Sequence, residues 1–487
     1  MVTGRSVASV RFVVVLGQYQ GMAANKSPFD VERARRETSG CDGVVHLNNA
    51  GAALPPDVVV ETVVDHLRRE ARMGGYEAAA AAAPRLEAVY RAIAELIGAA
   101  PAEIALAESA TRAWDMAFYG LRLGPEDVVL TGESEYSSNI IAFLQVMRRS
   151  GARLEIVGSD DDGVLDLLAL ERRLAELGSR AALVALTHVP TSNGVVQPAA
   201  QVGALTRAAG VPYLLDACQS VGQLPVDVGT IGCDLLSATG RKFLRAPRGT
   251  GFLYVSDAIR DRLEPPFLDL HAAEWVAEDR YELRPDARRF ESWEASVAGR
   301  LGLGAAVEYA LSWGMPAVER RVSGLAEQLR QKLAALPSVH VHDRGRRRCG
   351  IVTFSVAGLP ATTVAERLRA GGINTSVAAA DSARLDLGRR RLGDVVRASM
   401  HYYNTEDEID RLIAALAPMA GIRSASAGQV LGMDDIQAAP DDQPVDPNHT
   451  GTEAESSVPT GGNAAQAAAV FGEHAEPPSE MDSGGAG

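Results

Sequence analysis

The sequence predicts an α/β protein in which helices cover a doubly wound, mainly parallel sheet, followed by a smaller C-terminal α+β unit. Between about residues 46 and 419, short apolar β-branched runs alternate with amphipathic stretches, which is typical of such a sheet. Apolar residues make up 46% of the chain, enough to bury a large core. A length of 487 residues also exceeds that of one compact domain.

The predicted strands are short apolar runs that read as fully buried. They lie at residues 128–130, 154–157, 183–186, 213–215 and 252–255. Leu86, Val89, Ile93 and Leu96 have the spacing of one helix face, so a helix is expected there.

A second unit is expected after the helix-like run 298–313. Residues 325–336 and 363–370 have helical patterns, and residues 351–356 read as a strand. The expected organisation is a partly disordered N-terminal extension at 1–44, a large domain at 45–313, a small α+β domain at 314–420 and a disordered acidic tail at 421–487.

The charge of the chain argues against nucleic acid as a partner. Lys and Arg total 48 and Asp and Glu total 62, giving a net charge of −14. Residues 424–487 hold eleven of the acidic residues and no Lys or Arg, so the remainder carries only −3. A protein that binds nucleic acid by neutralising phosphates is basic. The tail has few large apolar side chains, which predicts disorder.

The sequence also gives no sign of a membrane span, a secretion signal or a metal site. No stretch reaches the ~18 to 20 apolar residues that cross a bilayer. The apolar run 10–17 is short and lacks a cleavage site, and Met22 is a possible alternative start. The cysteines are far apart without C-x-x-C spacing, which favours a reducing cytoplasm: they are Cys41, Cys218, Cys233 and Cys349.

Lys242 stands out because the chain supplies positive charge almost entirely as arginine. Only three lysines occur, against forty-five arginines, and Lys242 lies between Arg241 and Arg245. Arginine keeps its proton in proteins, whereas lysine can become a free amine and form a Schiff base. A surface lysine without a role is the alternative.

Asp216 lies twenty-six residues before Lys242, at the end of the predicted strand 213–215. Open α/β sheets bind ligands at the carboxyl ends of their strands. Pyridoxal 5'-phosphate needs a lysine for covalent attachment and a carboxylate that keeps its pyridine nitrogen protonated. Asp216 and Lys242 supply both groups, although an aspartate in this position is also a common helix cap.

A phosphate site is expected near Thr111. Ser109, Ala110 and Thr111 follow an apolar run and precede a helical stretch, so hydroxyl and amide groups meet at a helix N-terminus. A plain N-cap is the alternative. Thr239 and Arg241, just before Lys242, could contact the same phosphate.

Together these residues resemble the class V aminotransferase family of pyridoxal-phosphate enzymes, which includes cysteine desulfurases, selenocysteine lyases and isopenicillin N epimerase. The resemblance covers about residues 45–415. Its motifs are His46-Leu-Asn-Asn-Ala-Gly, Glu135-Tyr-Ser-Ser-Asn-Ile, Thr187-His-Val-Pro-Thr, Asp216-Ala-Cys-Gln, Thr239-Gly-Arg-Lys, Arg289-Phe-Glu and Arg397-Ala-Ser with Tyr403-Asn-Thr. It implies a fold-type I large domain, a smaller C-terminal domain and a homodimer with sites at the subunit interface.

The resemblance also implies a role for each matching residue. The implied catalytic residues are Lys242, Asp216 and Tyr136, which replaces the usual ring-stacking histidine. The implied cofactor-binding residues are Ala110, Thr111, Tyr136, Thr191, Asp216, Gln219, Thr239, Arg241 and Lys242. Arg397 matches the arginine that binds the substrate carboxylate, and Asn49 and Arg384 are taken as further substrate contacts.

Three departures from the family pattern bear on the reaction. Residues 376–394 contain no cysteine, although a cysteine desulfurase carries its nucleophile there; Trp293-Glu294 replaces a Gly-Thr pair; and an arginine expected near Ser376 is missing. The sequence therefore predicts a carbon–sulfur lyase that acts by β-elimination on a cysteine-derived amino acid, similar to class V members that cleave hercynylcysteine sulfoxide. An aminotransferase, an epimerase and a non-catalytic cofactor-binding regulator are the alternatives.

Overall fold

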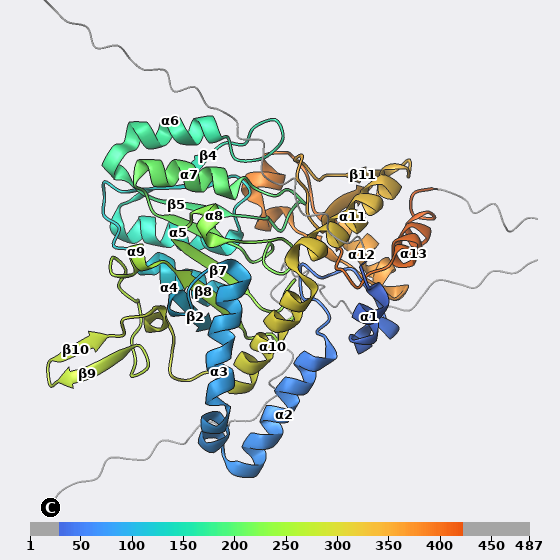
Figure 1. Ribbon diagram of the computed structural model, residues 1–487. Helices are drawn as coiled ribbons and strands as arrows, with labels where there is room; N and C mark the ends of the chain where they lie inside the picture. Colours follow the sequence, from blue (N-terminus) through green and yellow to red (C-terminus); the bar gives the residue numbers. More distant parts are fainter. Residues whose placement is uncertain (1–28, 422–487) are drawn as a thin grey trace, which may run out of the picture. The chain divides into compact units, whose positions relative to one another are not determined.

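A seven-stranded sheet forms the centre of the computed structural model, which describes residues 29–421 (Figure 1). Its strand order is β2-β8-β7-β6-β5-β3-β4. The strands are β2 (Ile104–Ala107), β3 (Val128–Gly132), β4 (Arg153–Val157), β5 (Ala181–Thr187), β6 (Tyr213–Asp216), β7 (Leu235–Thr239) and β8 (Gly251–Val255). Strands β3 to β7 pair in parallel. The predicted doubly wound, mainly parallel α/β sheet is confirmed.

Strand β8 runs antiparallel to both of its neighbours. A parallel return needs a crossover of a dozen or more residues, usually a helix. Residues 240–250, which connect β7 to β8, contain no helix, so the chain turns back beside β7. This short connection contains Lys242 and begins at the carboxyl end of a parallel strand.

The inner strands are mostly apolar because both faces of the sheet are covered. The edge strand β4 contains Arg153 and Glu155 and is only partly buried, so the expectation of a fully buried strand there is wrong. Successive residues of β3 alternate between two cores: Val128 and Leu130 pack in one, and Val129 packs in the other. Helices α3, α6, α7 and α10 contribute to the first core and α4 and α5 to the second. These helices are α3 (Gly75–Ile97), α4 (Ala110–Tyr119), α5 (Ser137–Ser150), α6 (Leu167–Leu177), α7 (Ala199–Ala209) and α10 (Val297–Trp313).

The C-terminal part has its own four-stranded antiparallel sheet, in the order β11-β12-β15-β14. The strands are β11 (Val339–Val341), β12 (Ile351–Val356), β14 (Ser376–Ala378) and β15 (Val395–Ser399), packed with α11 (Met315–Ala334), α12 (Ala361–Ala370) and α13 (Glu406–Leu416). Val45 and Leu47 also lie in this core, because β1 (Val45–His46) pairs with β13 (Ile373–Asn374). The domain division at residues 313 and 314 stays a prediction.

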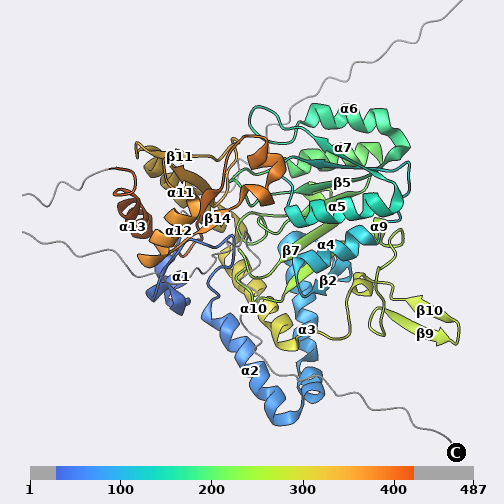
Figure 2. The same ribbon diagram turned by 180° about the vertical axis from the view of Figure 1, so that it is seen from behind.

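Several elements have no counterpart in the sequence expectations. They include α1 (Val31–Arg36), α2 (Asp57–Met73), the short helices α8 (Val228–Ile231) and α9 (Asp257–Arg260), and the hairpin of β9 (Ala273–Ala277) and β10 (Arg280–Leu283). Strands β7, β11, β14 and β15 and helix α13 were not predicted either. The hairpin extends away from the main sheet in both ribbon views (Figures 1 and 2). The expectations for residues 1–28 and for the acidic tail lie outside the described residues.

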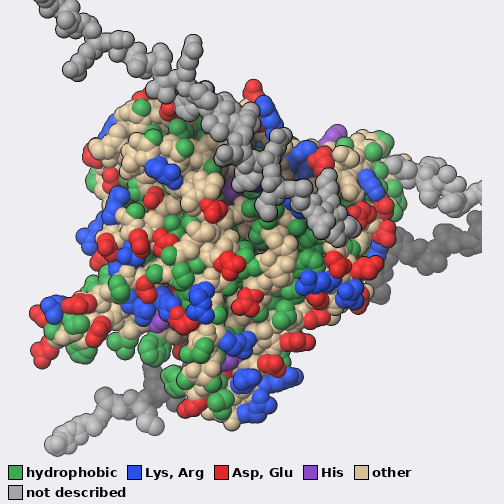
Figure 3. All heavy atoms as spheres, in the orientation of Figure 1, with side chains coloured by type: hydrophobic (Ala, Val, Ile, Leu, Met, Phe, Trp, Pro, Cys, Tyr) green, Lys and Arg blue, Asp and Glu red, His purple; other side chains and the backbone are tan. Residues whose placement is uncertain are grey.

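The surface drawn in Figure 3 mixes acidic and basic side chains rather than separating them. This distribution agrees with the small net charge left when the tail is set aside. Within residues 29–421, no helix combines the length and hydropathy that a membrane span requires.

Candidate active site

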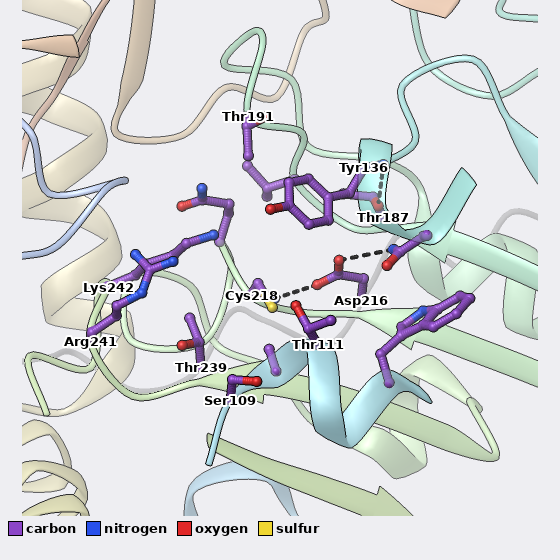
Figure 4. A pocket seen from close by; sticks show the side chains of 15 residues that line it. Ser109, Thr111, Tyr136, Thr187, Thr191, Asp216, Cys218, Thr239, Arg241 and Lys242 are labelled. Atoms are coloured by element: carbon purple, nitrogen blue, oxygen red, sulfur yellow. Dashed lines mark hydrogen bonds between the residues drawn. The ribbon is translucent and has the colours of Figure 1, made fainter. Parts of the chain in front are cut away.

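A pocket lies at the carboxyl ends of the parallel strands (Figure 4). All nine predicted cofactor-binding residues line it, together with six others. The lining residues are Ser109, Ala110, Thr111, Trp114, Tyr136, Asn139, Thr187, Val189, Thr191, Asp216, Cys218, Gln219, Thr239, Arg241 and Lys242. The sheet edge thus gathers residues that are more than a hundred positions apart.

Lys242 enters this pocket from the loop that follows β7, with only 8% of its surface exposed. Burial lowers the pKa of its amine, and the nearby Arg241 and Arg397 lower it further, although the Cys218 and Asp216 side chains oppose the shift. The lowered pKa favours the uncharged amine, which is the form that attacks a carbonyl carbon.

Arg245 fixes the loop that carries Lys242. Its guanidinium is buried and donates to the Leu54 carbonyl oxygen at 2.7 Å, to the Tyr402 hydroxyl at 2.8 Å and to the Thr38 hydroxyl. Its backbone has a φ of 64°, in the left-handed region that non-glycine residues rarely adopt. The sequence analysis considered Arg245 only as a charge, since its partners lie far away in the chain.

Asp216 ends strand β6, as predicted, and its carboxylate is buried in the pocket wall. Oδ1 accepts the backbone N–H of Cys218 at 2.9 Å, and Oδ2 accepts the Asn139 side-chain amide at 3.2 Å. In Figure 4, Lys242 and Arg241 reach the pocket from one side, and Asp216 lies across from them. The two groups required by pyridoxal phosphate therefore face one space.

The predicted anion site is present at the start of α4. Ser109 caps the helix, and its Oγ accepts the N–H of Arg112 at 3.1 Å, so the capping interpretation is correct as well. Thr111, Thr239 and Arg241 line the same pocket. Hydroxyl groups, a helix N-terminus and a guanidinium form a donor set that suits a phosphate.

An unpaired buried atom further supports a ligand in this pocket. Gln219 donates its Nε2 to the Ala50 carbonyl oxygen at 3.1 Å, but its Oε1 has no hydrogen-bond partner within the described chain. A buried polar atom without a partner is costly, and a bound polar group would satisfy it. The pocket residues therefore fit pyridoxal phosphate in charge, hydrogen bonding and amine chemistry.

Arg397 lies beside the pocket on β15. Its Nη1 donates to the Thr191 carbonyl oxygen at 3.3 Å, and its Nε is buried without a partner among the described residues. Burial, followed by repulsion from Arg241, lowers the pKa of Arg397 to about 10. An incompletely paired cation in this position is suited to receive a substrate carboxylate.

The other two predicted substrate contacts do not line the pocket. The buried Asn49 donates to the Ser399 carbonyl oxygen at 2.6 Å and accepts from Tyr403. The Arg384 side chain is 75% exposed and pairs with Asp381 at 2.8 Å. The structure thus gives both residues other partners, and their roles with substrate stay predictions.

Five lining residues had no role in the sequence analysis: Trp114, Asn139, Thr187, Val189 and Cys218. Asn139 and Thr187 stand inside motifs that were recognised as a whole, and Cys218 is two residues after Asp216. Their position beside recognised residues is the signal that could have identified them.

Comparison with known proteins identifies the family of this chain. The family model described as "Aminotransferase class-V" matches residues 45–412. A protein of Methanothermobacter thermautotrophicus named "Probable cysteine desulfurase" is 30% identical over 397 residues, which are 80% of this chain and 98% of that protein.

Two solved structures share the fold. The apo cysteine desulfurase of Thermococcus onnurineus NA1 has a TM-score of 0.74 and 26% identity, with 80% of this chain and 98% of that chain covered. The cystine C-S lyase C-DES, in complex with its product cysteine persulfide, has a TM-score of 0.70 and 23% identity, with 79% and 99% covered, which supports the fold alone.

The fold and the pocket together define a pyridoxal-phosphate enzyme of fold-type I. The chain belongs to the aminotransferase class-V family. The resemblance inferred from the sequence motifs is therefore confirmed.

Proposed function

We propose that this protein is a pyridoxal-phosphate-dependent carbon–sulfur lyase that acts by β-elimination on a cysteine-derived amino acid. The observation that carries the proposal is the meeting of Lys242 and Asp216 in one buried pocket, next to a phosphate-binding donor set and without a cysteine on residues 376–394.

The pocket residues divide the work of elimination among themselves. When bound, pyridoxal phosphate draws electrons away from the substrate's α-carbon. Lys242 would hold the cofactor through its amine and, as a free amine, would be placed to take the Cα proton of the substrate. Asp216 supports the positive charge at the ring nitrogen, and Arg397 orients the substrate carboxylate. The sulfur group leaves from Cβ.

The cysteines of this chain do not supply the nucleophile of a desulfurase, although relatives carry that name. Such a reaction needs a thiolate that attacks the sulfur of the substrate. Cys41, Cys233 and Cys349 are buried, and burial raises the pKa of Cys349 to about 11. Cys218 lines the pocket, but burial and Asp216 raise the pKa of its thiol.

The segment 376–394 is instead tied to the pocket wall through Asp386. Its Oδ2 accepts the Ser192 hydroxyl and the Asn193 amide, each at 2.7 Å, and its Oδ1 accepts from Arg390 at 3.2 Å. Ser192 and Asn193 directly follow the pocket residue Thr191. A segment held in this way can shape a substrate site without delivering a nucleophile.

We predict that Asp386→Ala raises KM for the substrate about tenfold, because the two buried hydrogen bonds from Ser192 and Asn193, beside Thr191, are lost. The cofactor should stay bound, since Asp386 does not line the pocket. Steady-state kinetics and the absorbance of bound cofactor provide the measurement. Asp381→Ala is the matched control. Asp381 is exposed, and within residues 29–421 its ion-pair partner is Arg384 alone.

The proposed assembly is a homodimer in the cytoplasm. Its support is the family resemblance, together with four exposed apolar side chains on α2: Val58, Val60, Leu67 and Met73. Light scattering of the purified protein tests the dimer, and a monomer at micromolar concentration would contradict it.

The reaction type is tested by the products formed from a panel of cysteine conjugates and cysteine sulfoxides. Elimination should yield pyruvate, ammonia and a thiol or sulfenate in equal amounts, because no protein group retains sulfur. Alanine together with a persulfide on the protein would instead indicate a desulfurase. If the amino group is transferred to a keto acid faster than pyruvate forms, the protein is an aminotransferase. If the substrate is racemised, it is an epimerase. If the cofactor binds but no amino acid is turned over, it is a regulatory protein.

A further inference from the structure

A second buried carboxyl group, Glu135, lies behind Asp216. Its Oε1 accepts the backbone N–H of Tyr136 at 2.9 Å and the Asn139 amide at 2.8 Å, and its Oε2 accepts the Thr131 hydroxyl at 2.8 Å. The Thr187 hydroxyl donates to Oε1 as well. Burial raises the pKa of Glu135, whereas these donors oppose the shift. None of the steps assigned above uses this group.

Asn139 connects the two carboxyl groups. Its Nδ2 carries two hydrogens, and it donates one to Glu135 at 2.8 Å and one to Asp216 Oδ2 at 3.2 Å. Glu135 lies just before Tyr136, the N-cap of α5, and Asn139 lies in the first turn of that helix, so the two side chains meet at the start of α5. If the amide were reversed, its carbonyl oxygen would face both carboxyl groups. The contact with Glu135 therefore orients the Asn139 amide so that its Nδ2, and not its Oδ1, faces Asp216.

We propose that Asn139, oriented by Glu135, is a positioning residue that keeps the Asp216 carboxylate fixed and anionic against the ring nitrogen of the cofactor. The inference rests on the proposed function. Asp216 is buried; its Oδ1 accepts the Cys218 N–H, and its Oδ2 accepts the Asn139 amide. A buried carboxylate that loses a donor becomes more basic, so the proton shared with the ring nitrogen would move toward Asp216.

The test places pyridoxal phosphate labelled with 15N in the ring on the wild-type chain, on Asn139→Ala and on Glu135→Gln, and records the ring-nitrogen signal by NMR. The wild type should show a protonated nitrogen. Asn139→Ala should shift the signal toward the unprotonated value and lower kcat about ten- to a hundredfold, with KM changed less than about threefold. Glu135→Gln should shift it in the same direction by a smaller amount, because glutamine keeps the size but does not impose one amide orientation.

Asn404→Ala is the matched control. Asn404 is also a buried asparagine that donates to a glutamate four positions away, with its Nδ2 2.7 Å from Glu408 Oε2, but it does not contact Asp216. Its loss should lower the melting temperature and leave the 15N signal unchanged. A purely structural role of Asn139 would give this same pattern and would overturn the inference.

The two proposals fail in different ways. A wild-type chain without borohydride-reducible cofactor on Lys242 overturns both the function and the inference. A wild-type chain with a protonated ring nitrogen whose signal is unchanged in Asn139→Ala and Glu135→Gln overturns the inference alone. Should Asn139→Ala not fold, Glu135→Gln decides, because its shifted signal supports the relay and its unchanged signal rejects it.

Discussion

Lys242→Ala is expected to lose the covalent attachment of pyridoxal phosphate and at least roughly a thousandfold in turnover. Lys242 is the buried amine of the pocket, and burial lowers its pKa toward the form that bonds to a carbonyl carbon. The same amine is the group placed to remove the Cα proton, so one substitution removes two functions. Borohydride reduction followed by peptide mass spectrometry measures the attachment.

Lys332→Ala provides the control for this experiment. Lys332 lies on α11, is partly exposed and pairs with Asp410, outside the pocket. Its removal should leave both the pyridoxyl adduct and turnover at the wild-type level. A reduced adduct found on the Lys242→Ala chain would show that another residue holds the cofactor, and the assignment of Lys242 would then be wrong.

The sheet and the cofactor pocket could be predicted because local patterns determine both. Short apolar runs read as strands, and five of them correspond to β3, β4, β5, β6 and β8. Asp216 ends β6, a predicted strand, and the carboxyl ends of paired parallel strands lie at one edge. Lys242 follows β7, the strand beside it, which the sequence analysis did not predict, so its place in the pocket was inferred from its chemistry and from the family resemblance. A lysine retained in an arginine-rich chain, together with Asp216, then indicated a cofactor that bonds to an amine, pyridoxal phosphate.

The contacts that support these residues could not be predicted, since they form only in the folded chain. Arg245 holds its loop through hydrogen bonds to Thr38, Leu54 and Tyr402. Glu135 contacts Asn139, whose amide reaches Asp216 at the end of β6. No periodicity of the sequence encodes such pairs. Arg384 was predicted to contact substrate only because of its position in a loop that matches the family. Its side chain is exposed in the structure, which does not support a contact with substrate.

Asp216→Ala is expected to lower kcat on the order of a hundred- to a thousandfold, the range seen when a preorganised charge that stabilises a transition state is removed. The carboxylate is buried opposite Lys242 and is held by two donors, so alanine leaves the positive charge of the ring nitrogen without a partner. Cofactor attachment through Lys242 should persist, because the anion site at the start of α4 and the Lys242 amine are unchanged.

Asp234→Ala separates this effect from a loss of stability. Asp234 also caps a strand edge beside β6, where its Oδ2 accepts the N–H of Tyr213 at 2.8 Å, but it does not line the pocket. Its substitution should lower the melting temperature while kcat changes less than about threefold. Asp216→Ala should do the opposite, with a large fall in kcat and a smaller change in melting temperature, since removing a buried carboxylate also relieves its desolvation cost. An Asp216→Ala enzyme that turns over at the wild-type rate would exclude Asp216 as the partner of the ring nitrogen.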